Sequence, residues 1–217
     1  GQQEAQDYST VLEGRKVYYI HLGCHSTNTV ADTFKINSIT LTPSAKIVAN
    51  NGTCIINHEK LTISDGITIS SHSCGIYNED IGEINTTNAN FLISLPYVSS
   101  AKLYAIYNEG TGKITLDDST ITLNASYSLG SSTSTPSLYG IYNTESEIII
   151  NNTDISSYSS SSSNYYYSYG IYNKSGKIDI SESNISLSSS ASSTYSMYGI
   201  YNDTGDINIS RSNIFST

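Results

Sequence analysis

The sequence predicts an all-β, single-domain parallel β-helix (solenoid) of about six to seven coils, each built from three short strands. Three observations support this fold class. A five-residue motif recurs at a nearly constant spacing, runs of alternating apolar and polar residues accompany each copy, and charged residues of alternating sign recur at one position of the repeat. Together these features define the repeating unit, its buried face and its stacking register.

The recurring motif reads tyrosine, glycine, isoleucine, tyrosine and asparagine over residues 169–173. Other copies begin at Cys74, Tyr104, Tyr139 and Tyr198, and a weaker copy, Cys54-Ile55-Ile56-Asn57, precedes them. The glycine position, which is alanine in one copy, advances from 75 to 105, 140, 170 and 199, in steps of 30, 35, 30 and 29 residues. Self-similarity at a period of about 20–50 residues indicates a solenoid, a propeller or an array.

Period-2 alternation within each unit predicts strands with one buried face. The motif isoleucines are expected to point inward and to stack as a ladder: Ile76, Ile106, Ile141, Ile171 and Ile200. The tyrosines that follow them are expected to face outward as a second ladder: Tyr77, Tyr107, Tyr142, Tyr172 and Tyr201. Strict alternation also places the residue before the glycine, such as Cys74, on the inner face.

The motif ends on an asparagine in every full copy, which predicts an asparagine ladder at a corner of the solenoid: Asn78, Asn108, Asn143, Asn173 and Asn202. Stacked amides can donate hydrogen bonds from one coil to the next, as they do in cross-β structures. We interpret the isoleucine, tyrosine and asparagine columns as architecture.

Charges of alternating sign occupy the position just before the second strand of the repeat: Lys60, Glu83, Lys113, Glu147, Lys177 and Asp206. Stacked strands lie about 4.8 Å apart, so opposite charges in neighbouring coils attract and like charges repel. Each exposed pair contributes only about 0.2–1 kcal/mol. The column therefore indicates the stacking register more than a source of stability.

Along the chain, we expect residues 1–33 to form an N-terminal arm or cap and residues 34–217 to form the β-helix, with repeats starting near 54, 75, 105, 140, 170 and 199. Residues 17–22 read as a strand without a partner in the repeat. The first unit is the shortest, and the later ones are longer because loops precede the motif strand. This placement is typical of solenoids, in which insertions gather on one face.

The composition excludes two classes of partner. The net charge is −9 and the pI is about 4.7, whereas nucleic-acid binding calls for a basic stripe. No run approaches the roughly 20 apolar residues of a membrane helix, so we expect no membrane insertion. Charged residues make up 13% of the chain and tryptophan is absent. A surface rich in hydroxyl and amide groups is typical of extracellular or cell-surface proteins.

The cysteines and histidines all fall within residues 21–74: His21, Cys24, His25, Cys54, His58, His72 and Cys74. One interpretation is a metal site across neighbouring coils, but the spacing matches no zinc signature, and we predict neither a metal nor a cofactor. The other is one disulfide with a leftover thiol. Alternation separates Cys54 and Cys74 onto opposite faces, so Cys24–Cys54 is the candidate disulfide.

We predict that the protein is not an enzyme. β-Helical lyases and hydrolases need clustered carboxylates in a groove. Here the acidic residues Glu79-Asp80, Asp117-Asp118 and Asp203 fall in different repeats and columns.

Asparagine glycosylation sequons are frequent, and the candidate acceptors outside the asparagine ladder are Asn51, Asn85, Asn124, Asn151, Asn184 and Asn208.

The motif resembles the GIYN-type repeats of bacterial surface and autotransporter-like β-helix proteins, over about residues 45–217. The resemblance implies a right-handed solenoid and is specific for architecture, since such solenoids serve as adhesins, stalks and enzyme scaffolds. We expect an extracellular structural protein that assembles head to tail with itself into a surface filament or appendage. The alternative is an adhesin fragment that binds glycans or host surface proteins.

Overall fold

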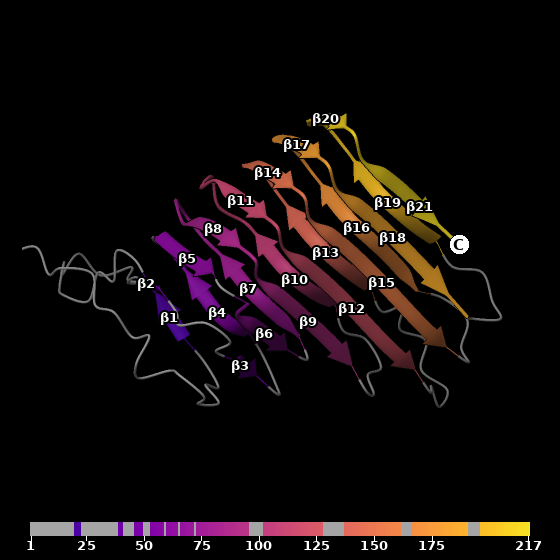
Figure 1. The fold of residues 1–217 in the computed structure, drawn as a ribbon, viewed down its shortest axis with the longest axis horizontal. Coiled ribbons are helices and arrows are strands. Elements are labelled where there is room, and N and C mark those ends of the chain that lie inside the picture. The colour runs from indigo at the N-terminus through magenta and orange to yellow at the C-terminus, as the bar shows by residue number, and fades with distance from the viewer. Residues whose placement is uncertain are drawn as a thin grey trace, which may run out of the picture.

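The structure, a computed structural model, describes residues 20–22, 39–40, 46–49, 53–58, 60–64, 66–71, 73–95, 102–127, 137–161, 166–190 and 196–217. Within these ranges all regular structure is β-strand, numbered β1 to β21 in chain order (Figure 1). Every third strand joins the same parallel sheet, which gives three sheets of seven strands. The predicted fold class, an all-β parallel β-helix, is confirmed.

Each coil contributes one strand to each sheet. The first sheet contains β1 (Ile20–Leu22), β4 (Thr53–Asn57), β7 (Cys74–Asn78), β10 (Lys102–Asn108), β13 (Ser137–Asn143), β16 (Tyr167–Asn173) and β19 (Ser196–Asn202). The second sheet contains β2 (Ile39–Thr40), β5 (Lys60–Ser64), β8 (Glu83–Thr87), β11 (Ile114–Asp117), β14 (Glu147–Asn151), β17 (Lys177–Ser181) and β20 (Asp206–Ser210). The third sheet contains β3 (Lys46–Ala49), β6 (Thr68–Ser71), β9 (Asn90–Leu95), β12 (Thr120–Tyr127), β15 (Asp154–Ser161), β18 (Asn184–Ser189) and β21 (Asn213–Ser216).

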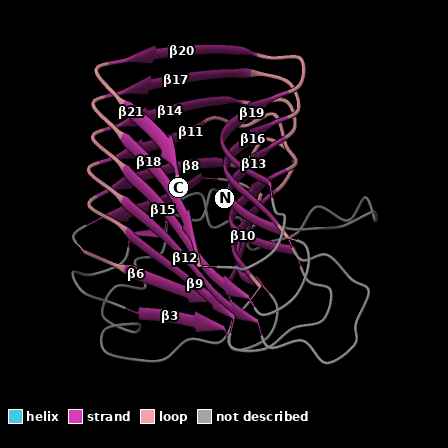
Figure 2. Ribbon diagram, turned by 90° about the vertical axis from the view of Figure 1, so that its right-hand side faces the viewer, coloured by secondary structure: helices cyan, strands magenta, loops and turns pink. Residues whose placement is uncertain are grey.

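Equivalent residues of successive coils lie side by side, because the strands pair in parallel without a shift of register. In the first sheet, Ile141 pairs with Ile106 on one side and Ile171 on the other. Figure 2 shows the strands of each sheet stacked one above another along the solenoid. Each position of the repeat therefore becomes a column of side chains.

The core consists of apolar columns from all three sheets. The motif isoleucines Ile76, Ile106, Ile141 and Ile171 are each 0% exposed. The second sheet adds columns such as Ile114, Ile148 and Ile178, and the third adds Ile121, Ile155 and Ile185. Because the three sheets face a narrow interior, a modest apolar content is enough to fill it.

Strict alternation fails at the glycine of the motif, which is a correction to the predicted facing. Leu103 is buried and Tyr104 half-buried, but both Ala105 and Ile106 are then fully buried. Two consecutive inward residues shift the phase of the strand, so the tyrosine before the glycine lies outside with the tyrosine after the isoleucine. Cys74 occupies this same outer column, in register with Tyr104, and not the inner face.

Close packing explains why the motif carries glycine at this position. A Cβ atom on Gly170 would lie 2.3 Å from Ile185 Cγ2 in the third sheet and 2.5 Å from the carbonyl oxygen of Gly199. Gly199 has the same relation to Ile214 Cγ2, also at 2.3 Å. At Gly170 and Gly199, contacts this short exclude a side chain unless the sheets move apart, whereas the equivalent Ala105 is accommodated fully buried.

From β8 onward, the corner between the second and third sheets has two residues, and the first lies in the left-handed region, with positive φ at Asn88, Asp118, Asn152, Glu182 and Arg211. Three residues separate β5 from β6, and Gly66 among them has positive φ. Asparagine and aspartate tolerate this conformation better than most residues, while Glu182 and Arg211 do not share that preference and pair with each other through Arg211 Nη2 and Glu182 Oε1 at 2.7 Å.

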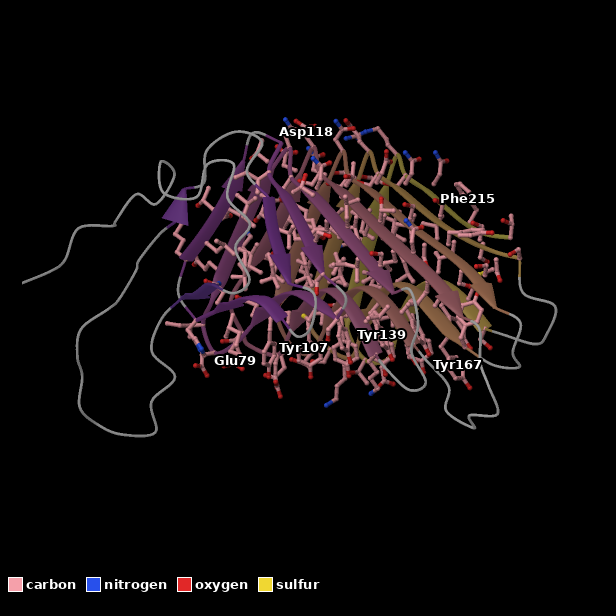
Figure 3. All side chains as sticks on the ribbon, turned by 90° about the horizontal axis from the view of Figure 1, so that it is seen from below. Glu79, Tyr107, Asp118, Tyr139, Tyr167 and Phe215 are labelled. Atoms are coloured by element: carbon pink, nitrogen blue, oxygen red, sulfur yellow. The ribbon has the colours of Figure 1, made fainter. Side chains whose placement is uncertain are left out.

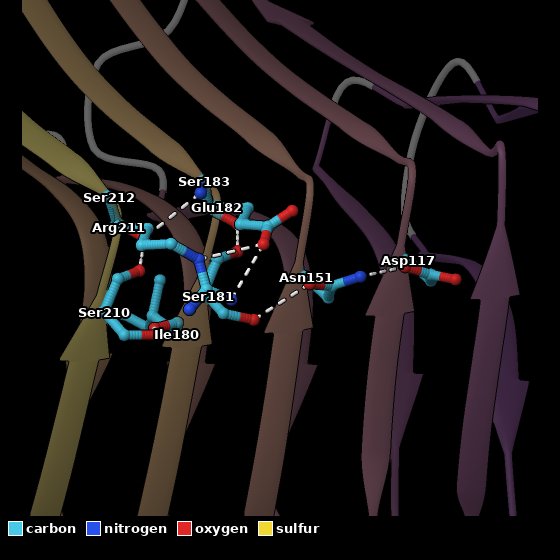
Figure 4. Close-up of polar contacts among 9 residues, drawn as sticks. All are labelled: Asp117, Asn151, Ile180, Ser181, Glu182, Ser183, Ser210, Arg211 and Ser212. Carbon is cyan, nitrogen blue, oxygen red and sulfur yellow. Dashed lines mark hydrogen bonds and ion pairs between the residues drawn. The ribbon is translucent and has the colours of Figure 1, made fainter.

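The next residue of this corner forms a hydroxyl ladder that we did not predict (Figure 4). The backbone N–H of Thr153 donates to Ser183 Oγ at 3.1 Å, and that of Ser183 donates to Ser212 Oγ at 3.1 Å. Each hydroxyl in turn donates to the carbonyl oxygen two residues earlier, as Ser183 does to Ser181 at 2.7 Å. The ladder also includes Ser119. It satisfies backbone groups that a tight corner would otherwise leave unpaired.

Within the expected N-terminal arm or cap, residues 1–33, the structure describes residues 20–22, and it corrects the expectation that this strand has no partner in the repeat. Ile20–Leu22 forms β1, which pairs in parallel with β4, so that Ile20 lies in register with Ile55 and Leu22 with Asn57. This stretch is therefore a strand of the first sheet and not a segment outside the repeat. The other residues of 1–33 lie outside the described ranges.

In the part of the chain that the structure describes, no helix is long and apolar enough to cross a membrane.

Candidate functional site

The asparagine ladder runs continuously along the corner between the first and second sheets. Each Nδ2 donates to the Oδ1 of the asparagine in the next coil, at 2.7 Å from Asn57 to Asn78 and at 2.8 Å in the four steps that follow. The second amide hydrogen binds a carbonyl oxygen of the turn, as from Asn143 to Ser146 at 3.0 Å. Asn57, the end of the weak motif copy, begins the ladder, and the asparagines up to Asn173 are fully buried.

The outer face of the first sheet carries two columns of tyrosines. One column is Tyr104, Tyr139, Tyr169 and Tyr198, and the other is Tyr77, Tyr107, Tyr142, Tyr172 and Tyr201. We call this surface the tyrosine flank. Figure 3 shows Tyr107, Tyr139 and Tyr167 along one side of the solenoid, together with Glu79, while Asp118 and Phe215 lie on the opposite side.

The rings of the tyrosine flank pack in a herringbone pattern. From Tyr104 and Tyr107 onward, the rings within a column are nearly parallel, as for Tyr142 and Tyr172, whose centroids lie 4.9 Å apart with planes 1° from parallel. Tyr77 and Tyr107 are instead tilted by 54°. Between columns they are nearly perpendicular, as for Tyr139 and Tyr142 at 5.3 Å and 86°. Stacked and edge-to-face pairs are the two arrangements that aromatic quadrupoles favour. Most ring faces of the flank therefore contact other tyrosine rings.

The packing of the flank changes the acidity of its phenols. Burial, and then the neighbouring phenols, raise the pKa of Tyr104 and of Tyr169 well above the ordinary value. Burial, and then the Glu109 carboxylate that accepts a hydrogen bond from the phenol, raise the pKa of Tyr77 further. The phenols of Tyr77, Tyr104 and Tyr169 thus remain protonated and uncharged over the physiological pH range.

The flank provides a pH prediction. Because these phenols are harder to ionise when folded, the unfolded chain releases protons above its own tyrosine pKa of about 10, and stability falls as the pH rises beyond that value. We expect spectrophotometric titration of phenolate absorbance to leave part of the nineteen tyrosines protonated well above pH 10 in native protein. In denaturant all should titrate together near pH 10. Coincident native and denatured curves would contradict the buried packing of the flank.

Beside the flank, the turn after each first-sheet strand forms one more column. The residue that follows the ladder asparagine reads His58, Glu79, Glu109, Thr144, Lys174 and Asp203. Backbone N–H groups hold this column in register, since Glu79 donates to the carbonyl oxygen of Asn57 and Glu109 to that of Asn78, both at 2.9 Å. We call it the turn column.

At one end of the turn column an imidazole lies between two carboxylates. His58 Nε2 lies 3.3 Å from Glu79 Oε2, and His58 Nδ1 lies 3.2 Å from Asp80 Oδ2. The His58 side chain is 5% exposed, that of Glu79 19% and that of Asp80 70%. Sequence reasoning placed His58 with the cysteines and missed these partners. Extending the repeat alignment by one residue beyond the asparagine would have found them.

The charge column of the second sheet is stacked in register, with Glu147 beside Lys177 and Lys177 beside Asp206. Ion pairs join Lys113 Nζ to Glu147 Oε2 at 3.1 Å and Lys177 Nζ to Glu147 Oε1 at 3.5 Å. The two lysines, Lys113 first, lower the pKa of Glu147 below its ordinary value. All these groups are substantially exposed, so their effect on stability is small.

The candidate cysteine pair remains a prediction, because Cys24 and the side chain of Cys54 lie outside the described residues. Cys74 is buried, and its Sγ lies 3.3 Å from the carbonyl oxygen of Ile76. Among the candidate glycosylation acceptors, Asn124 is exposed and Asn85 half-buried. Asn151, Asn184 and Asn208 donate hydrogen bonds to aspartates of the preceding coil, at 2.7, 2.8 and 2.7 Å. Asn51 lies outside the described ranges.

Comparison with known proteins adds no assignment, since no family model, no curated protein and no solved structure matches the chain.

Proposed function

We propose that the protein is a structural solenoid without a catalytic role, which assembles end to end with copies of itself into a filament or appendage at the cell surface. The observation that carries this proposal is the repetition of every stacking ladder in register from coil to coil. Isoleucine, asparagine, hydroxyl and tyrosine columns each contact near-copies of themselves in the neighbouring coils. A coil from a second copy would therefore meet the same partners as a coil of the same chain.

The coil formed by β19–β21 presents these columns to solvent. Ile180 is 2% exposed, whereas Ile209, its partner in this coil, is 48% exposed. Ile185 is 0% exposed, whereas its partner Ile214 is 38% exposed. A further coil stacked on β19–β21 would bury these apolar ladder residues. A contact between opposite ends of two copies is heterologous and does not close on itself, so it would extend into a filament.

The outward columns support a location outside the cell. They are rich in serine, threonine and asparagine, and the exposed Asn124 lies within a glycosylation sequon. The net charge of −9 would keep such rods apart laterally while leaving end contacts apolar.

The test is the oligomeric state of the 217-residue chain, measured by light scattering and electron microscopy over a range of concentrations. We expect rods whose length grows with concentration. Ile209→Lys, which places a charge on the exposed coil edge, should abolish growth, while Phe215→Lys should not. Phe215 lies in the same coil and is 52% exposed, but it belongs to the outward column of Ser186.

Wild-type protein that stays monomeric at high concentration would overturn end-to-end assembly and favour the adhesin alternative. Equal effects of the two lysine variants would mean that association uses the flanks and not the coil edge. Circular dichroism of both variants keeps unfolding separate from loss of assembly.

A further inference from the structure

The turn column differs from the charge column of the second sheet in the order of its charges. On the second sheet, stacked charges alternate in sign from Glu147 to Lys177 to Asp206. In the turn column two acidic residues, Glu79 and Glu109, occupy successive coils, and Asp80 adds a third carboxylate next in the chain. Like charges in stacked positions repel, and natural sequences tolerate such conflicts chiefly at functional sites.

Among the described residues, two carboxylates share one imidazole. Glu79 and Asp80 both form ion pairs with the ring of His58, one at each ring nitrogen. Glu109 accepts the hydrogen bond of the Tyr77 phenol, which stays uncharged. An excess of negative charge that is partly removed from water is stabilised by a bound cation.

The geometry at His58 suits a metal ion. One ligand atom from each of His58, Glu79 and Asp80 lies within 4.8 Å of the other two. Only one of the two ring nitrogens can bind the ion. The 3.3 Å separation between His58 Nε2 and Glu79 Oε2 is near that between two ligands that share an ion with bonds of about 2.0–2.2 Å, and the Asp80 carboxylate is the third group of the set.

We propose that His58, Glu79 and Asp80 bind a divalent transition-metal cation of the zinc type, which joins two successive coils at the start of the tyrosine flank. One imidazole nitrogen and two carboxylates form a mixed nitrogen and oxygen set that zinc accepts. Calcium requires six to eight oxygen ligands and is disfavoured. The exposed Asp80 provides the route of entry, and water completes the coordination. This site replaces the cysteine–histidine metal site that the sequence suggested and that we rejected.

Isothermal titration of the full chain with Zn²⁺ tests the proposal. The decisive variant is Asp80→Asn, and the matched control is Asp118→Asn. Both aspartates are exposed, both have positive φ, at 54° and 47°, and both substitutions remove one negative charge. Asparagine adopts this backbone conformation as readily as aspartate. Glu79→Gln provides a second ligand variant of unchanged size.

Because other histidines and cysteines of the chain can also take zinc, the measure is the difference between variants. We expect Asp80→Asn and Glu79→Gln to lose one equivalent of Zn²⁺ or to bind it at least about tenfold more weakly, while Asp118→Asn matches wild type. A chelator should lower the melting temperature of zinc-loaded wild type and Asp118→Asn more than that of Asp80→Asn.

Three results would overturn the site. These are identical zinc isotherms for all four proteins, an equal loss in Asp118→Asn, and Ca²⁺ binding as tight as Zn²⁺. The first would leave His58 as an ion-pair partner only, and the other two would indicate non-specific attraction of cations to an acidic chain.

Discussion

Ile171→Asp should unfold the solenoid around β16, with a loss of more than about 3 kcal/mol in the free energy of unfolding. Ile171 is 0% exposed and lies in register between Ile141 and Ile200. A carboxylate at this position would have aliphatic side chains in both neighbouring coils and no partner to repay its lost hydration. Urea denaturation followed by circular dichroism measures the effect.

The neighbouring residue provides the control. Tyr172 is half-buried on the tyrosine flank, where it stacks on Tyr142 and Tyr201 with centroids 4.9 Å away in both cases. Tyr172→Ser removes aromatic contacts but buries no charge, so we expect a loss of about 1–2 kcal/mol. If the two variants lose equal stability, the inward and outward assignments in this strand are wrong.

The second large effect concerns the middle of the asparagine ladder. Asn143→Ala should lower the free energy of unfolding by about 2–4 kcal/mol, because it leaves several buried polar groups without hydrogen-bond partners. Asn143 receives a hydrogen bond from Asn108 and donates to Asn173, both at 2.8 Å. Its Oδ1 also accepts from the Ser146 hydroxyl at 2.9 Å. Chemical denaturation of the purified wild type and variant measures this change in the free energy of unfolding.

Asn202→Ala tests the same ladder where water can replace the lost bonds. Asn202 accepts from Asn173 at 2.8 Å in the same geometry, but its side chain is exposed. We expect a loss of about 1 kcal/mol or less. A loss at Asn202 as large as that at Asn143 would show that the ladder acts through local turn geometry and not through burial of its amides.

The features that repeat with a constant period could be predicted from the sequence alone. The isoleucine columns, the asparagine ladder and the sign alternation around Glu147 could all be predicted, because one register satisfies all of them. The strand at β1 was predicted, but its pairing with β4 was missed, since the two match over only three residues and β1 carries no motif. A short match of apolar and polar residues is too common to identify a repeat by itself.

The facing of the second tyrosine column could not be predicted from alternation. It depends on the approach of Ile185 to Gly170, a contact between sheets that local periodicity does not encode. The hydroxyl ladder, in contrast, left a readable signal. Residues 119, 153, 183 and 212 are serine or threonine in every case, two positions before an isoleucine. The aligned column at His58 was equally visible, but Glu79 and Asp203, which both belong to it, were assigned to different columns.

The parallel register has a consequence for how the chain reaches its folded state. Every strand pair joins segments about one repeat apart, so no contact requires the ends of the chain to meet. Such a chain behaves as a row of coupled units, in which folding can start at any well-packed coil and spread to its neighbours. A local defect then acts as a boundary at which cooperativity ends. Damage at β16 should therefore be transmitted outward coil by coil, in steps that hydrogen exchange can resolve.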